Sequence, residues 1–233
     1  MNKATFALLL FIIVFNTSFA QGISDISLMK INDAAAQDDG VIDFDNPNTY
    51  IGTPYSNPDF VLGSIYRNDS LIFNMVALRY NAISDQIEIK ESLSTPNEEI
   101  RNLKKSAELV AKIGKTKFIF MPYEGEVSKG DFLEIIYDGT QVDIYKKHEK
   151  DVRYPIKASS SITRDLPAKF TDKPLYFLVT RRQQFYLFPK SRKSKFKIFG
   201  QKEGLMKSYA KENKLDANVE EDLIQIVSHY EKQ

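Results

Sequence analysis

The sequence contains no cysteine and no tryptophan, and it has only two histidines. Without cysteine the chain has no disulfide, no catalytic thiol and no Cys-based zinc site, and no lipid can be attached to an N-terminal cysteine. Neither His148 nor His229 has a second histidine or a carboxylate at ligand spacing on its own predicted element. We therefore expect both histidines to be solvated or paired within the protein, not catalytic or metal-bound.

The motifs of nucleophilic catalysis and phosphate binding are also missing. No G-x-S-x-G, G-x-G-x-x-G or G-x-x-x-x-G-K-[ST] pattern occurs, and Gly114-Lys115-Thr116 lacks the earlier glycine of a phosphate loop. The sequence therefore predicts no cofactor and no metal. Two carboxylates are enough for glycoside hydrolysis, and acidic pairs occur at Asp43/Asp45, Glu124/Glu126 and Glu221/Asp222. A carboxylate-based hydrolase stays open as the weakest alternative.

One long apolar run occurs, and it lies at the start of the chain. Lys3 precedes the run Phe6 to Phe15, and Ser18 and Ala20 are small residues at the positions that a signal peptidase reads. The run is about ten residues, about half of what a membrane-spanning helix needs. We predict that residues 1–20 form a signal peptide, that it is cleaved after Ala20, and that the processed chain has no transmembrane segment.

Charge is balanced overall but unevenly distributed. Residues 21–100 hold 13 acids and 4 bases, whereas residues 145–207 hold 17 bases and 5 acids. Such asymmetry marks either a partner surface or two parts of one domain that neutralise each other. Both interpretations stay open at this point.

Period-two apolar patterns and turn residues dominate the middle of the chain. Hairpin turns are expected at 67–70, 81–85, 114–115, 138–139 and 181–184, and a last strand is expected over Lys195–Phe199. Residues 150–168 read as a charged, serine-rich connection, and a short strand is possible at Val41–Phe44. The expected organisation is an extended arm over 21–58 and a β-rich domain over 59–199, built from antiparallel hairpins as a sheet or sandwich.

The last residues change to helical spacing. An apolar stripe comprises Val219, Leu223, Ile226, Val227 and Tyr230, and Leu205, Met206 and Tyr209 mark a shorter helix before it. Asn218 and Glu221 have the spacing of a capping box. The fold class predicted is mainly β with a C-terminal helical pair, residues 200–233, packed on the β-rich domain.

Seven short segments of the chain form a distinctive set: Gly52 to Asn57, Phe60 to Gly63, Leu78-Arg79-Tyr80-Asn81, Asp85 to Glu88, Asn213-Lys214-Leu215, Glu221-Asp222-Leu223 and His229-Tyr230. In these segments the chain resembles a family of uncharacterised small exported proteins of Bacteroidetes-type bacteria. The resemblance implies export and supplies no activity. The helical C-terminus is unlike the β-sandwich sorting domain that sends such proteins to the cell surface, so we expect a periplasmic location, with secretion as the alternative.

Within these segments Arg79, Tyr80 and Asn81 form the most distinctive motif. Arg79 lies within an otherwise apolar strand, after Met75 to Leu78, and must therefore reach water or a carboxylate. We expect it to pair with Glu88 across the turn 81–85, a structural role, with ligand binding as the alternative.

The strongest functional candidate is a basic stretch interleaved with aromatic residues. Its basic residues are Arg181, Arg182, Lys190, Arg192, Lys193, Lys195 and Lys197. Export argues against nucleic acid as the partner and favours lipid head groups, lipopolysaccharide or acidic glycans. The alternative is simple strand alternation, with the lysines of 195–199 facing solvent along an edge strand.

One modification motif is present. Asp69-Ser70-Leu71 resembles the acceptor for O-glycosylation of exported proteins in that lineage, which makes Ser70 a candidate site.

Taken together, the sequence favours a non-enzymatic, exported cell-envelope protein with an interaction or structural role and an envelope protein as its partner. The runner-up is a module that binds an anionic envelope molecule through a basic β face.

Overall fold

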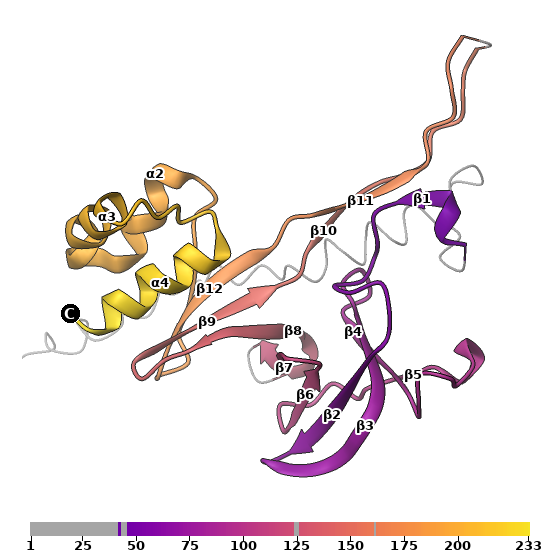
Figure 1. Cartoon of the computed structure of the whole chain (residues 1–233), viewed down its shortest axis with the longest axis horizontal. Coiled ribbons are helices and arrows are strands. Elements are labelled where there is room, and N and C mark those ends of the chain that lie inside the picture. Colours follow the sequence, from indigo (N-terminus) through magenta and orange to yellow (C-terminus); the bar gives the residue numbers. More distant parts are fainter. Residues whose placement is uncertain (1–41, 43–45, 124–125, 161) are drawn as a thin grey trace, which may run out of the picture.

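The computed structural model describes residues 42, 46–123, 126–160 and 162–233. The expected signal peptide and the expected strand at Val41–Phe44 lie outside the described residues. The remaining chain is mostly β, with two helices at its C-terminal end, as the sequence predicts (Figure 1).

The strands form two sheets. The large antiparallel sheet has the order β13-β12-β9-β8-β7-β6-β2-β3-β4-β5, and the small mixed sheet has the order β1-β11-β10. The strands of the large sheet are β2 (Val61–Arg67), β3 (Ser70–Asn81), β4 (Gln86–Lys90), β5 (Arg101–Asn102), β6 (Leu109–Ile113), β7 (Thr116–Tyr123), β8 (Glu126–Asp138), β9 (Val142–Lys147), β12 (Leu175–Thr180) and β13 (Phe185–Leu187). The strands of the small sheet are β1 (Tyr50–Ile51), β10 (Lys150–Arg153) and β11 (Ala168–Asp172).

Helical segments fill the C-terminal end, and two short 3-10 turns lie earlier in the chain. The helical segments are η1 (Pro47–Thr49), η2 (Asn97–Glu99), α2 (Arg192–Lys195), η3 (Phe196–Lys202), α3 (Glu203–Glu212) and α4 (Glu220–Glu231). No helix among these described segments has both the length and the apolar character needed to cross a membrane.

Local turn chemistry explains the hairpins. Asn68 and Asp69 both have positive φ, 48° and 64°, as the two-residue loop between β2 and β3 requires. Gly63 lies where β2 runs closely between β3 and β6. A Cβ there would stand 2.2 Å from the Lys112 carbonyl oxygen, so only glycine fits.

The first half of the large sheet curls around an aromatic core, which we call the strand core. Although β3 and β8 are not neighbours in the sheet, the backbone N–H of Phe132 on β8 donates to Asp85 Oδ1 in the β3–β4 turn, at 2.9 Å. Tyr80 packs against Phe118 and Phe132 inside this curl, with ring centroids 5.1 and 6.4 Å apart. The curl therefore brings opposite parts of the sheet into contact.

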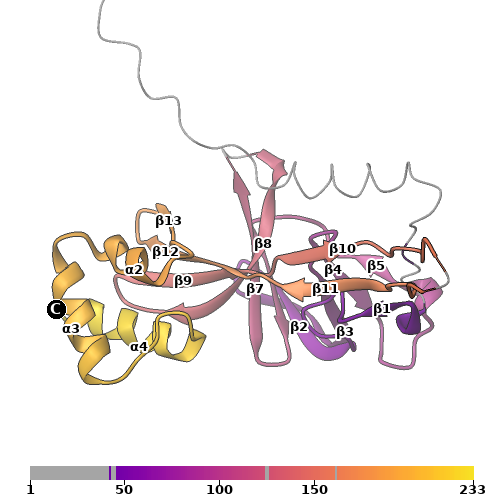
Figure 2. The same ribbon diagram turned by 90° about the horizontal axis from the view of Figure 1, so that it is seen from above.

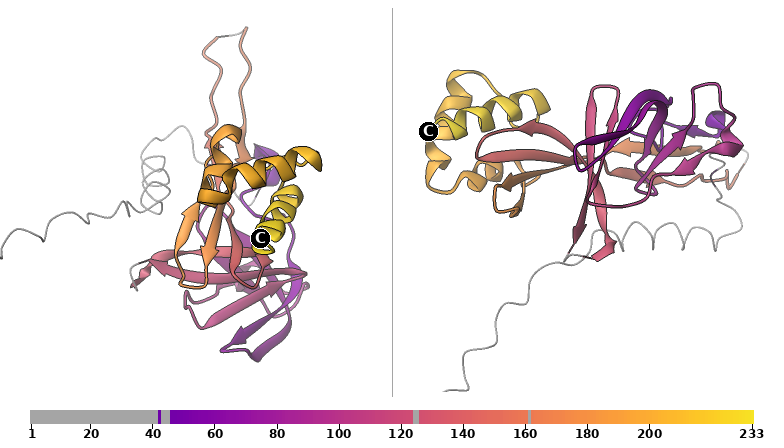
Figure 3. Two further views of the ribbon diagram at one scale, coloured as in Figure 1. Left: turned by 90° about the vertical axis from the view of Figure 1, so that its left-hand side faces the viewer. Right: turned by 90° about the horizontal axis from the view of Figure 1, so that it is seen from below.

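A second core, the helix core, lies between the helices and the strands β9 and β12. The two cores occupy opposite ends of an elongated molecule, with β7 and β8 standing between them (Figures 2 and 3). Of the predicted apolar stripe on α4, Leu223, Ile226 and Val227 are fully buried there and Tyr230 is partly buried, whereas Val219 is 45% exposed.

The expected strand over Lys195–Phe199 is wrong, because these residues are helical. The N–H groups of Ser194 and Lys195 both donate to the Ser191 carbonyl, which starts α2. Helical spacing buries both Phe196 and Phe199 in the helix core, whereas strand alternation would place them on opposite faces. Helical structure thus begins at Arg192, earlier than residue 200.

Two further predictions need correction. Residues 150–168 are not a plain connection, since they hold β10 and lead into β11 as the two sides of a long projecting hairpin (Figure 1). The N-cap of α4 is Val219 and carries no side-chain cap bond. Asn218 bonds Asp216 instead, and Asp222 accepts from the Asp216 N–H at 2.7 Å.

Candidate functional site

Arg79 forms the ion pair that the sequence predicts. It stands directly opposite Glu88 in the β3–β4 register, and its Nε and Nη2 atoms donate to Glu88 Oε2 at 3.0 and 2.6 Å. The two side chains are only 14% and 12% exposed, so this is a nearly buried pair and not a surface contact.

Aromatic residues of the N-terminal arm enclose the same guanidinium. Its carbon lies 3.6 Å from the Tyr55 ring centroid and 4.3 Å from that of Phe60, and its Nη1 atom donates to the Pro58 carbonyl at 3.2 Å. Arg79 therefore fastens residues 55–60 to the sheet by charge and cation–π contacts. These contacts occupy the guanidinium, which favours the structural role over ligand binding.

The other two motif residues hold the adjacent turn. The Asn81 side-chain amide donates to Glu88 Oε1 at 3.2 Å, while its oxygen accepts from the N–H groups of Ile83 and Ser84. Tyr80 points to the strand core, and its hydroxyl donates to Asp85 at 2.8 Å. The motif is thus a turn-and-arm clamp.

Asp85 is the first member of a buried ionic network that our sequence analysis missed. Besides Tyr80 and the Phe132 N–H, Lys105 donates to it at 2.5 Å. Burial raises the pKa of Asp85 above its ordinary value, Lys105 opposes that shift, and the charge of Asp131 adds to it. Because Asp85 lies in the β3–β4 turn and accepts from the Phe132 N–H, its carboxylate connects this turn to β8.

Two more pairs continue the network through β8 and β9. Lys147 donates to Asp131 at 2.5 Å, with only 7% and 3% of the side chains exposed. His148 contacts Glu134 at 2.5 Å and lies against the rings of Tyr80 and Phe118, so this histidine is paired within the protein.

The network reaches the helices through Glu220. Lys146 contacts Glu220 at 2.7 Å and Glu134 at 3.7 Å, and the Tyr176 hydroxyl donates to Glu220 at 2.9 Å. Burial raises the pKa of Tyr176 well above its ordinary value, and the hydrogen bond to Glu220 and the charge of Glu220 raise it further. Within the described ranges no three His, Cys, Asp or Glu residues are grouped to hold a metal. Through His148, Glu134, Lys146 and Glu220 the network connects the strand core to the helix core.

The basic stretch does not form one face. Arg181 is committed to the β8–β9 turn, because it donates to the carbonyls of Thr140 and Gly139 and pairs with Asp143 at 3.1 Å. Arg182 lies exposed in the β12–β13 loop, and Lys197 is exposed on η3. The remaining members are Lys190, beyond β13, and Arg192, Lys193 and Lys195, which belong to α2.

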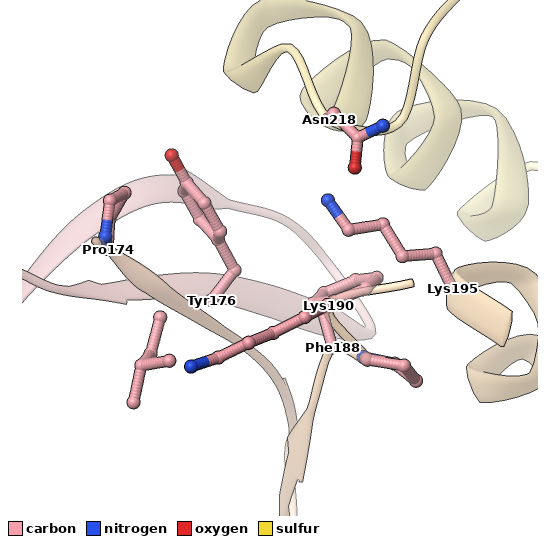
Figure 4. A pocket seen from close by; sticks show the side chains of 8 residues that line it. Pro174, Tyr176, Phe188, Lys190, Lys195 and Asn218 are labelled. Atoms are coloured by element: carbon pink, nitrogen blue, oxygen red, sulfur yellow. The ribbon is translucent and has the colours of Figure 1, made fainter. Parts of the chain in front are cut away.

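Two of the basic residues line a pocket of about 220 Å³ beside the helices (Figure 4). Its walls come from the start of β12, the segment that follows β13, α2 and the loop before α4. The lining residues are Pro174, Leu175, Tyr176, Phe188, Pro189, Lys190, Lys195 and Asn218. No carboxylate lines it, so it gives the hydrolase alternative no acid pair.

The two pocket lysines do not converge. Lys195 is 7% exposed, and its Nζ donates to the Ala217 carbonyl at 2.7 Å. Burial lowers the pKa of Lys195, and the charge of Asp216 opposes that shift. Lys190 runs along the pocket with its amine directed away from that of Lys195 (Figure 4). The expectation that Lys195 faces solvent on a strand is therefore wrong.

Ser70 is exposed at the first position of β3, directly after the β2–β3 turn. The predicted acids Asp43, Asp45 and Glu124 lie outside the described residues.

Comparison with protein families, with curated proteins and with solved structures gives no match to this chain.

Proposed function

We propose that this protein is an exported, non-enzymatic interaction protein of the cell envelope, which acts in the periplasm after residues 1–20 are removed. The observation that carries the proposal is an exposed apolar hairpin end. Four large apolar side chains are exposed within five residues of β3: Leu71 (51%), Ile72 (38%), Phe73 (51%) and Met75 (61%). Grouped apolar exposure of this kind is typical of an interaction surface.

The hairpin end is built for side-chain contact and not for further strand pairing. β4 pairs with β3 only from Ala77 onward, so Ser70–Val76 has β2 alone as its strand neighbour. The β2–β3 register shifts twice along this stretch, and Met75 takes a φ of 57°. Such bulges twist an edge and disfavour a regular ladder, while the apolar side chains stay accessible.

Site-specific photo-crosslinking in the living cell tests this role. A benzoylphenylalanine in place of Phe73 should give a discrete cross-linked adduct with an envelope protein. Leu205 is the matched control, because it is also an exposed apolar residue, at 46%, but lies on α3 at the opposite end of the molecule (Figure 2). Equal adducts from both positions, or no adduct from Phe73, would remove the support for the proposal.

A second candidate function is binding of an anionic envelope molecule. It is favoured by the exposed positions of Arg182, Lys190 and Lys197, of which Lys190 also lines the pocket. Binding to vesicles with anionic lipid should then weaken between 0.01 M and 0.1 M salt, as the Debye length falls from about 30 Å to about 10 Å.

The variant for this second test follows from the structure. Arg182, Lys190 and Lys197 are changed together to Gln, while the buried Lys195 is kept. Lys112, Lys115 and Lys117, which are exposed on the β6–β7 hairpin, give a control triple of equal charge. Equal loss of binding in both triples would mean that only the overall charge matters.

A further inference from the structure

β13 is the outermost strand at the helical end of the large sheet. On the inner side of β13, the Gln184 carbonyl accepts from the Thr180 N–H at 3.1 Å, and the Phe188 N–H donates to the Tyr176 carbonyl at 2.8 Å. Because facing residues alternate in an antiparallel ladder, Gln184, Tyr186 and Phe188 bond inward to β12. The backbone groups of Phe185 and Leu187 therefore point outward, away from the sheet.

This outer edge is open along its length. In the part of the chain that the structure describes, no strand pairs with it, and Phe185, Tyr186 and Leu187 are 36%, 46% and 47% exposed. The β12–β13 register is regular, so no bulge turns the edge away. Phe185 rests against the rings of Tyr145 and Phe177, 5.9 and 6.2 Å away, which supports the strand from one face.

The charge around the edge indicates what it can accept. Arg182 and Lys190 flank β13, and both are exposed. No acidic residue occurs between Asp172 and Glu203, so the surrounding segment is basic in sequence. An extended partner with acidic residues beside its pairing segment is therefore complementary to this edge.

A second copy of the chain fits the edge poorly. If two β13 strands paired antiparallel about Tyr186, Arg182 of each copy would approach Lys190 of the other. Like charges opposite each other in a ladder destabilise the pairing. The charge pattern thus selects against self-association and for an acidic partner.

We infer that the outer edge of β13 binds an extended acidic segment of a partner protein as an additional strand. Backbone bonds to Phe185 and Leu187 would supply the affinity, and Arg182 and Lys190 would select for acidic ends. The inference rests on the proposed interaction function, but it concerns the opposite end of the strand order from β3. Its failure is therefore distinguishable from a failure of the Phe73 cross-link.

The test is a titration with labelled synthetic peptides, read by fluorescence anisotropy on the processed protein. The probe has a Thr-Val-Thr-Val-Thr centre with two acidic residues at each end. Its counterparts carry two lysines at each end, or N-methyl groups on the valines, which remove backbone donors. The acidic probe should bind, and both counterparts should bind at least about fivefold more weakly.

Two protein variants separate backbone pairing from side-chain contact. Leu187→Pro and Leu187→Ala both remove the leucine side chain, but only the proline also removes the outward N–H while leaving the β12 ladder intact. We expect Leu187→Pro to bind the acidic probe about fivefold to tenfold more weakly than Leu187→Ala. Equal binding by the two variants would overturn the inference.

A charge-reversal variant keeps the test decisive if Leu187→Pro unfolds. Arg182→Glu with Lys190→Glu retains every backbone group, and it should exchange the preference from the acidic to the lysine-ended probe. Binding that ignores this reversal contradicts the inference. So does concentration-dependent dimerisation of the unmodified protein that Leu187→Pro abolishes, because the edge would then be a self-association surface.

Discussion

Glu231 shows how a single side chain joins distant segments. An acid at the C-terminal end of a helix is unfavourable for the helix dipole, yet Glu231 ends α4. Its carboxylate accepts from the Tyr137 hydroxyl at 2.6 Å and from the N–H groups of Gln141 and Val142 at 2.6 and 2.8 Å. The β8–β9 turn thus gains a carboxylate acceptor from a residue about ninety positions later.

This arrangement predicts a pH dependence of stability. Burial by itself would raise the pKa of Glu231, but the bonds from Tyr137 and the turn N–H groups outweigh it and lower the pKa below its ordinary value of 4.5. A lowered folded-state pKa stabilises the fold above pH 4.5, and this stabilisation is lost as the pH falls through the folded-state pKa.

We therefore expect Glu231→Gln to be less stable than the parent at pH 7, with a difference that shrinks as the pH falls below 4.5. Urea denaturation at several pH values measures it, and Glu212→Gln, at the end of α3, is the control. A difference that stays constant from pH 7 to pH 3 would contradict the role given to the Glu231 charge.

Arg79 makes a second prediction at the residue scale. Removing its side chain by Arg79→Ala leaves Glu88 nearly buried without its cation, so we expect a loss of about 3 kcal/mol in the free energy of unfolding. Arg79→Lys keeps the charge but not the planar fork or the ring contacts, and should lose less. A loss under about 0.5 kcal/mol for Arg79→Ala would show that the clamp on the arm is dispensable.

At the scale of elements, α4 tests the apolar stripe that the sequence predicts. Ile226 is fully buried, whereas Val219 belongs to the same predicted stripe but is 45% exposed at the N-cap. Ile226→Asp should cost several kcal/mol, because it buries a charge without a partner, and Val219→Asp should cost less than about 1 kcal/mol. Similar melting temperatures for both variants would mean that α4 does not pack as described.

The elements also show where sequence reasoning succeeds. The turns at 67–70, 81–85, 114–115, 138–139 and 181–184 lie between paired strands as predicted. Turn residues and period-two alternation are local signals, and they need no knowledge of the rest of the fold. Lysine and apolar residues alternate in the segment 195–199, and this alternation is the reason that a strand is predicted there. Burial follows helical spacing instead, because Phe196 and Phe199, three residues apart, are both buried.

At the scale of the whole molecule, the structure predicts that amide hydrogen exchange differs between the projecting β10–β11 hairpin and the central strands β7 to β9. Residues 154–166 extend beyond the paired part of β10 and β11, and their apolar residues Ile156, Ile162 and Leu166 are exposed. Strands β7 to β9 pair on both sides.

We expect amides in 156–160 and 162–166 to exchange at least about 100-fold faster than those of β7 to β9, since Ile156, Ile162 and Leu166 are exposed and belong to none of the described hydrophobic clusters. Hydrogen–deuterium exchange with mass spectrometry measures this difference. Comparable protection would mean that the hairpin is stabilised by contacts beyond its own two strands.

The sequence by itself determined the mainly β character, the positions of most hairpins, the final helical pair and the Arg79–Glu88 pair. Each depends on residues that are close in the chain, so turn chemistry, periodicity and register are enough to infer it.

Only the tertiary structure decided which charges are buried and which surfaces are open. Strand pairing brings Asp131 to Lys147 and Arg181 to the β8–β9 turn. The packing of the helices brings Lys195 to the Ala217 carbonyl and Glu231 to the same turn. The free edge of β13 has the same origin, since it depends on the order of the strands. Contacts between residues far apart in the chain are set by packing and not by local pattern, which is why one sequence did not disclose them.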